Sequence, residues 1–217
     1  MDTLHELARS CEEQILKRQL SQGGWGYGTS KQWVTETTCL ALLALRLQPS
    51  RVYAQGVEFL LRCQNPNGSW PAFAGDDDPE GSWVTALAVI VLIRLAGDWK
   101  AVERGVSWLL TVQGRESHWL MKWRYRFIDR KVKFDPDKYG WPWTVGASSW
   151  VVPTAYSLIA LRQAFTCCVP EAIDRRLKKA VEMLLDRGCP GGGWNAGNGM
   201  AHDVALEIGR ASCRERV

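Results

Sequence analysis

The chain has 217 residues, of which 46% are hydrophobic, so it is long and apolar enough to bury a sizeable core as one domain. A net charge of +4 is only mildly basic and requires no nucleic-acid partner. The seven cysteines are odd in number and lack Cys-x-x-Cys spacing, which predicts reduced thiols in a cytoplasmic protein. Residues 1–10 carry no signal-peptide pattern, and the longest apolar run, residues 83–93, is too short to cross a bilayer. Peripheral contact with a membrane stays open.

The first half of the chain is predicted to form two helical pairs, each with an amphipathic outer helix and an apolar inner helix. The outer helices are expected at residues 4–19 and 51–64. The inner helices are expected at residues 33–47 and 83–95, and the second of these is apolar nearly all round. We therefore expect residues 83–95 to be enclosed. A third outer helix is predicted to begin after Asp98, a good N-cap residue.

The second half repeats this order around an insertion at residues 120–149, which is too long for a simple connection. Within it, aromatic and basic residues alternate, and this period of two predicts a short strand or hairpin rim. A third inner helix is expected from Trp150, and a fourth outer helix at residues 170–187. The apolar residues of this fourth outer helix follow i, i+4 steps: Ile173, Leu177, Val181 and Leu185.

Short motifs recur at fixed places in this order. The frame of Gln, Gly four residues later and Trp six later occurs at Gln64, Gly68 and Trp70. Other copies, some incomplete, are Gln19-Gly23-Trp25, Gln113-Ser117-Trp119 and Gly192-Trp194. A Trp-Val pair opens each inner helix, at Trp33-Val34, Trp83-Val84 and Trp150-Val151. Such recurrence indicates one supersecondary unit that stacks on copies of itself to bury its apolar face.

These repeats resemble those of the superfamily of squalene-hopene cyclases, oxidosqualene cyclases and protein prenyltransferases, over residues 4–207. The resemblance implies an all-α fold, an α/α toroid in which apolar inner helices line a barrel. It also implies that each motif Gln amide ties the end of an outer helix to the start of the next inner one. Structural roles in the repeat are accordingly expected for Gln19, Trp25, Gln64, Gly68, Trp70, Gln113, Trp119 and Trp194.

The family's cyclases carry a general acid in an Asp-x-Asp-Asp segment, which this sequence lacks. Two places come near it. Asp77 lies in a run of three aspartates that also fits a solvated acidic turn, and Glu36 opens an inner helix, where it also suits the helix dipole. Both are candidate catalytic residues, and if the protein is an enzyme the resemblance implies a triterpene cyclase or a prenyltransferase.

The zinc site of the prenyltransferases has no counterpart, since Cys189 and His202-Asp203 match no ligand pattern, so no metal or cofactor is expected. The implied ligand is a hydrophobic, isoprenoid-like molecule. Aromatic residues outside the repeat frame are candidates for its apolar part: Trp33, Trp83, Trp141, Trp143 and Trp150. Basic residues of the insertion, with Arg124 and Arg126 foremost, are candidates for an anionic head group or form a solvated cap: Lys122, Arg124, Arg126, Arg130, Lys131 and Lys133.

The last residues, 207–217, have no repeat character and look like a translated sequencing-library adapter, the alternative being a genuine polar tail. They stand where a fourth inner helix is due, so residues 1–206 are expected to be one toroid domain of a longer protein. Two functions follow: an isoprenoid-binding, terpene-cyclase-like repeat domain, or a non-catalytic helical scaffold that binds other proteins.

Overall fold

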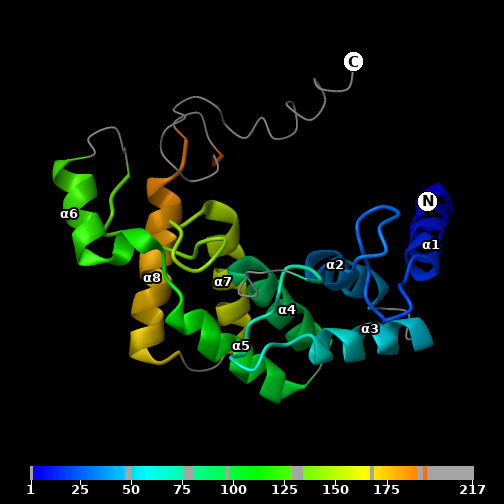
Figure 1. Ribbon diagram of the computed structural model, residues 1–217. Coiled ribbons are helices and arrows are strands. Elements are labelled where there is room, and N and C mark those ends of the chain that lie inside the picture. Colours follow the sequence, from blue (N-terminus) through cyan, green and yellow to red (C-terminus); the bar gives the residue numbers. More distant parts are fainter. Residues whose placement is uncertain are drawn as a thin grey trace. The chain divides into compact units, whose positions relative to one another are not determined.

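The computed structural model describes residues 2–46, 50–75, 81–95, 98–128, 134–166, 169–189 and 193–194. Regular structure within these ranges is helical, with a few isolated β-bridges at the turns (Figure 1). The chain divides into two compact units, Met1–Leu109 and Leu110–Val217. The proposed adapter at residues 207–217 lies outside the described residues.

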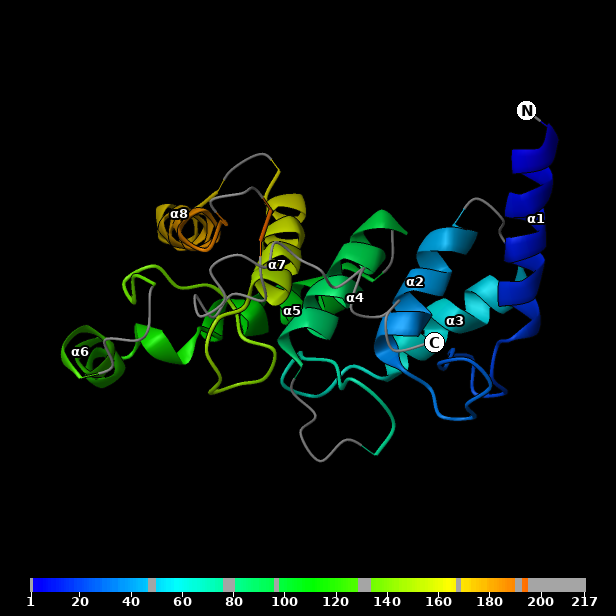
Figure 2. The same cartoon turned by 90° about the horizontal axis from the view of Figure 1, so that it is seen from above.

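The first unit contains two apolar inner helices, α2 (Thr35–Leu45) and α4 (Ser82–Arg94). Its amphipathic outer helices are α1 (Asp2–Lys17), α3 (Arg51–Arg62) and α5 (Trp99–Thr111), the last of which runs across the unit boundary. Helix α2 packs against α4 on one side and α3 on another (Figure 2). Every residue of α4 from Val84 to Leu92 is buried, so the expectation of an enclosed helix here is confirmed.

The second unit contains a short 3-10 helix, η1 (Arg115–Ser117), followed by α6 (Trp119–Phe127). The inner helix α7 (Val151–Ala164) then packs against the outer helix α8 (Glu171–Asp186). Of the residues at i, i+4 steps in α8, Leu177 is buried together with Ala180 and Met183, whereas Val181 and Leu185 are exposed. Helix α8 is therefore rotated away from the face that its longest aliphatic residues mark.

The first two motif turns are held by the same hydrogen bonds. The Gln19 amide donates to the carbonyls of Gly23 and Val52, both at 2.7 Å. The Gln64 amide donates equivalently to Gly68 at 3.0 Å and Ala101 at 2.9 Å. Since Val52 and Ala101 lie in the first turns of α3 and α5, each Gln ties its turn to the next outer helix, not to the next inner helix as expected.

Glycine is needed in these turns for two reasons. Gly23 and Gly68 have φ angles of +104° and +99°, in the region that favours glycine. A Cβ at Gly23 would also lie 2.8 Å from the carbonyl oxygen of Gln55, and one at Gly68 would collide with that of Arg104. The turns thus let the backbone of the following outer helix approach closely.

A second set of bonds joins each motif Trp to the next inner helix. The Trp25 and Trp70 backbone N–H groups donate to the hydroxyls of Thr38 and Thr85 at 3.0 and 2.9 Å. Each indole donates to a carbonyl ten residues earlier, Trp25 to Ile15 and Trp70 to Leu60, both at 2.8 Å. The motif Trp is therefore the residue that links an outer helix to the inner helix of the same pair.

In the third turn this place is taken by Trp141 and not by Trp119. The Trp141 N–H donates to the hydroxyl of Thr154 at 2.9 Å, and its side chain is fully buried. Trp119 is 72% exposed and begins α6, and Gln113 is exposed as well. The insertion has moved the Trp of this repeat some twenty residues along the chain. Trp119 matches the Gln-Gly-Trp spacing but does not form the turn.

Arg176 lies on α8, the outer helix that follows the third turn, and its side chain binds that turn. Its guanidinium lies 3.7 Å from the centre of the Trp141 ring and donates to the carbonyls of Gly140 and Tyr139 at 2.8 and 3.1 Å. A further bond reaches the carbonyl of Val112 at 3.3 Å. An arginine thus does in the third turn what a glutamine amide does in the first two.

The fourth turn keeps the indole bond. Trp194 Nε1 donates to the carbonyl of Leu184 at 2.6 Å, again ten residues earlier, and Gly188 and Trp194 form an isolated bridge. The Trp-Val pairs, by contrast, are not equivalent. Val34 and Trp150 stand at the N-caps of α2 and α7, whereas Trp83 is the second residue inside α4.

The strand or hairpin predicted for the insertion is also wrong, because residues 119–127 form helix α6. The segment Trp-Leu-Met-Lys-Trp-Arg-Tyr-Arg-Phe has no β-branched residue, glycine or proline, and its Leu, Met, Lys and Arg all favour helix. Helical propensity here prevails over an alternation of aromatic and basic residues.

Candidate functional site

The inner helices leave apolar side chains uncovered within their own units. On α2 the exposed residues include Leu40 and Ala44, and on α7 they include Val152 and Ile159. Both helices are mainly apolar and have no distinct polar face, so amphipathicity does not explain why these apolar side chains are exposed. Exposed apolar surface on a helix that is mostly buried marks a place where a ligand or a further structural element packs.

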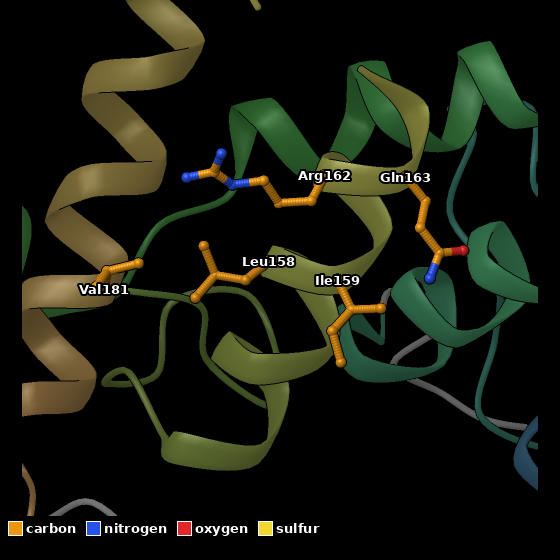
Figure 3. Close-up of a pocket in the computed structure, with 5 residues that line it drawn as sticks. All are labelled: Leu158, Ile159, Arg162, Gln163 and Val181. Atoms are coloured by element: carbon orange, nitrogen blue, oxygen red, sulfur yellow. The ribbon is translucent and has the colours of Figure 1, made fainter. Parts of the chain in front are cut away.

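A pocket of about 340 Å³ lies on α7 and reaches α8 (Figure 3). Leu158 and Val181 point toward one another between the two helices, and Ile159 continues the apolar wall along α7. Arg162 and Gln163 follow one turn later and supply the polar groups of the lining. An apolar wall with an amide and a guanidinium at one end suits an amphiphilic ligand with an anionic or polar end.

Glu36, the candidate acid, lies in the first turn of α2, where it accepts a hydrogen bond from the hydroxyl of Tyr27. Partial burial, together with Glu36, raises the pKa of Tyr27 to about 12. Glu36 therefore acts as a hydrogen-bond acceptor at a helix N-terminus, a position that suits an acidic side chain on structural grounds alone. Burial and Glu36 also raise the pKa of the neighbouring Cys39 thiol, which makes that thiol unreactive.

The aromatic candidates fall into two groups. Trp33, Trp83, Trp143 and Trp150 are half-buried, and Trp33 packs edge-on against Phe59 with 5.3 Å between ring centres. Trp141 is fully buried in the third turn, beneath the Arg176 guanidinium. None of these indoles lines the pocket on α7.

Sequence reasoning missed a buried ionic cluster in the second unit. Both carboxylate oxygens of Glu116 accept from the Ser149 N–H at 3.1 Å, and Arg187 Nη2 lies 3.5 Å from Glu116 Oε1. The Arg187 guanidinium also stacks 4.0 Å from the centre of the Phe134 ring. Burial lowers the pKa of Arg187, and the Glu116 carboxylate opposes this. These contacts fasten the two ends of the insertion to the end of α8. Because the cluster is closed to solvent, a substrate cannot reach it.

The basic candidates Arg124 and Arg126 lie on α6. Arg126 and Lys122 both pair with Asp137, at 2.7 and 2.9 Å, and lower the pKa of its carboxyl, with Lys122 the larger cause. Arg124 is exposed. The other basic residues of the insertion, Arg130, Lys131 and Lys133, lie outside the described residues.

The candidate Asp77 lies outside the described residues, as does the pair His202-Asp203, to which the sequence assigns no metal. Within the part of the chain that the structure describes, no group of three or more His, Cys, Asp or Glu side chains could hold a metal ion. The described helices likewise include none long and apolar enough to cross a membrane.

The alternation of outer helix, hydrogen-bonded turn and apolar inner helix defines a helical-hairpin repeat protein, and the expected all-α class is confirmed for the described residues. No protein-family model matches the chain. The chain is similar to squalene–hopene cyclase of Bradyrhizobium diazoefficiens, with 28% identity over 128 residues, or 58% of this chain and 17% of the cyclase. It is also similar to human lanosterol synthase, with 37% identity over 79 residues, 30% of this chain and 11% of the synthase. These matches confirm the resemblance to the squalene cyclase-like superfamily, and the chain spans less than a fifth of either relative.

Among solved structures, the type II terpene cyclase MstE from Scytonema matches with a TM-score of 0.38 and 17% identity, covering 90% of this chain and 67% of that enzyme. A variant of MstE in complex with geranylgeranyl dihydroxybenzoate, its substrate, matches with a TM-score of 0.39 and 16% identity, covering 90% and 66%.

Proposed function

We propose that the chain is part of a terpene-cyclase-like repeat protein and that it binds an isoprenoid-type ligand against the apolar face of its inner helices. The observation that carries this is the pocket on α7, in which Leu158, Ile159 and Val181 form an apolar wall beside Arg162. The branched hydrocarbon chain of an isoprenoid suits the wall, and a polar or diphosphate end suits the guanidinium. The similarity to squalene–hopene cyclase supports the same ligand class.

Chemistry is a separate part of the proposal. The resemblance implies a triterpene cyclase or a prenyltransferase, but Glu36 is placed as a helix-start carboxylate beside Tyr27. Within the described residues, the structure therefore supports ligand binding more strongly than proton transfer. Formation of a cyclic product from squalene would establish a triterpene cyclase, and transfer of a prenyl group would establish a prenyltransferase.

Binding is tested by titrating the chain with squalene in detergent and with geranylgeranyl diphosphate, followed by tryptophan fluorescence. Products are sought by mass spectrometry in the same samples. Ile159→Asp places a charge on the apolar wall, and it is expected to weaken binding at least about tenfold. Leu185→Asp is the matched control, since Leu185 is exposed on α8 and does not line the pocket.

Saturable binding that Ile159→Asp weakens and Leu185→Asp leaves unchanged supports the proposal. If neither compound binds, or both variants bind as the parent does, the isoprenoid function is rejected and the protein-binding scaffold becomes the better account.

A further inference from the structure

Three cationic side chains of the second unit gather around the ring of Tyr139. Lys122 of α6 and Lys179 of α8 place their ammonium nitrogens 5.5 and 5.4 Å from the ring centre. The Arg176 guanidinium lies 5.1 Å from the same centre. All four residues are half-buried, so water screens these charges less than it does at an exposed surface. Two helices that are distant in the sequence thus bring like charges to one place.

Carboxylates balance only part of this charge. Asp137 pairs with Lys122 at 2.9 Å and with Arg126 at 2.7 Å, so one carboxylate is shared between two cations. Lys179 forms no ion pair with another described residue, and it donates to the Asp137 backbone carbonyl at 3.5 Å, which is long for a hydrogen bond. The hydrogen bonds of Arg176 go to backbone carbonyls. The group therefore keeps a net positive charge.

Positive charge is costly at this place. Burial lowers the pKa of Arg176 to about 10, and Tyr139 and Glu116 oppose this only in part. The Tyr139 ring attracts each cation, yet it adds no net negative charge that would offset the repulsion among the three. A phosphoryl oxyanion would remove that repulsion, because lysine and arginine both neutralise it and donate charge-assisted hydrogen bonds to it.

These cations are separate from the pocket on α7. Val181 points toward α7 (Figure 3), and Lys179 precedes it by two residues, which places the two side chains about 160° apart around α8. Arg176 lies about 60° from Lys179 around the same helix. An anion beside Tyr139 and a ligand in the pocket would therefore contact opposite faces of α8.

We propose that Lys122, Arg176 and Lys179, the cationic cluster, form a binding site for a polyvalent phosphoryl anion such as diphosphate. The two ammonium groups supply rotatable donors to the anion. The Arg176 guanidinium is held by backbone carbonyls and contributes mainly its charge. Asp137 competes with the anion for Lys122 and so limits the affinity. This inference does not depend on the ligand proposed for α7.

The test is isothermal titration calorimetry of the 217-residue chain with inorganic diphosphate, at a constant ionic strength of about 0.1 M so that general screening stays fixed. Saturable binding is expected. Lys122→Gln and Lys179→Gln are each expected to weaken it at least about fivefold, because each removes a charge-assisted contact. Lys178→Gln is the matched control, since Lys178 is exposed on α8 and pairs with Asp174 at 2.7 Å.

Asp137→Asn tests the site in the opposite direction. It is expected to strengthen diphosphate binding about threefold or more, because it removes the carboxylate that competes for Lys122. If the cluster is only structural, the same variant loses stability and gains no affinity. Asp174→Asn is the matched control, since it removes a carboxylate that pairs with Lys178 instead. Circular dichroism of each variant verifies folding.

The outcomes also separate this site from the isoprenoid function. Ile159→Asp, which is expected to weaken binding at α7, should leave the binding of inorganic diphosphate unchanged. Weaker binding in the two cluster variants, with tighter binding in Asp137→Asn, supports the proposal. Absence of saturable binding overturns it, as does equal binding by the cluster variants and their controls. Loss of diphosphate binding in Ile159→Asp also overturns it and assigns the anion to the pocket on α7.

Discussion

Arg176 and Gln64 solve the same structural problem with different side chains. Each brings donors to carbonyl groups at a turn, and those carbonyls would otherwise be turned away from water. Gln64 reaches forward from its turn to Ala101 in the next outer helix, whereas Arg176 reaches back from the next outer helix to Tyr139 and Gly140. The Arg176 guanidinium also stacks on the Trp141 ring, and a neutral amide would make a weaker stacking contact.

Replacing Arg176 by Met should destabilise the second unit by about 3 kcal/mol or more, because buried carbonyls lose charged donors and Trp141 loses its stacking partner. Arg176→Lys should recover only part of this, since an ammonium cannot reproduce the planar fork. The measurement is the free energy of unfolding in urea. The control is Arg175→Met, whose side chain is 70% exposed on the same helix. Equal stability of the Met variants at 175 and 176 would refute the role given to Arg176.

The Gln-Gly-Trp spacing identifies the first two turns and misplaces the third. Trp119 stands six residues after Gln113, so the frame selects it, yet the Trp that forms the turn is Trp141. A second signal was present in the sequence. A Thr follows Trp25 and Trp141 by 13 residues and Trp70 by 15, and that Thr accepts the Trp N–H each time. An insertion between the Gln and the Trp changes the Gln-to-Trp spacing. It leaves the Trp-to-Thr spacing almost unchanged, because that spacing spans only the turn and the start of the inner helix.

The close approach of outer and inner helices depends on small residues between them. Gly105 of α5 lies against α4 and the Trp70 ring, where a Cβ would come within 2.6 Å of Val89 Cγ2 and 3.0 Å of the indole. Both neighbours are fully buried and stiff, so neither yields easily. Gly56 of α3 has the corresponding place against Trp25.

Gly105→Ala should therefore destabilise the first unit by about 1 kcal/mol, although alanine favours the helix by a similar amount. Overpacking costs about 1–3 kcal/mol, and this outweighs the gain in helix propensity. Thermal and urea unfolding measure the change. Ser107→Ala, at an exposed position of the same helix, should be neutral or slightly stabilising. A stabilised Gly105→Ala variant would show that α4 and α5 are not packed this closely.

The inner helices were the most predictable elements and α6 the least. Residues 83–95 were expected as an enclosed helix because no face is polar, and α4 occupies Ser82–Arg94. In α6 the same kind of evidence misled, because alternating aromatic and basic residues also occur on a helix that is held by one face only. The position of α6 follows from the contacts of Tyr125 with Phe134 and of Arg126 with Asp137, and the local sequence pattern of α6 does not contain these partners.

For the molecule as a whole, two compact units share one construction, in which Trp and Thr join the helices of a pair and Gln or Arg joins successive pairs. Large apolar side chains are exposed on the inner helices and on α6, and the outer helices expose several as well, namely Leu4, Leu7, Trp99, Val181 and Leu185. We propose that the apolar surface on the inner helix α7 binds an isoprenoid-type ligand.

The most direct test of the ligand claim is photo-crosslinking of the 217-residue chain with a farnesyl probe that carries a diazirine, followed by peptide mapping by mass spectrometry. We expect the label to be concentrated on α7 around Ile159 and to be displaced by unlabelled geranylgeranyl diphosphate or squalene. Label confined to the outer faces of α3 and α8, or label that no isoprenoid displaces, would contradict it.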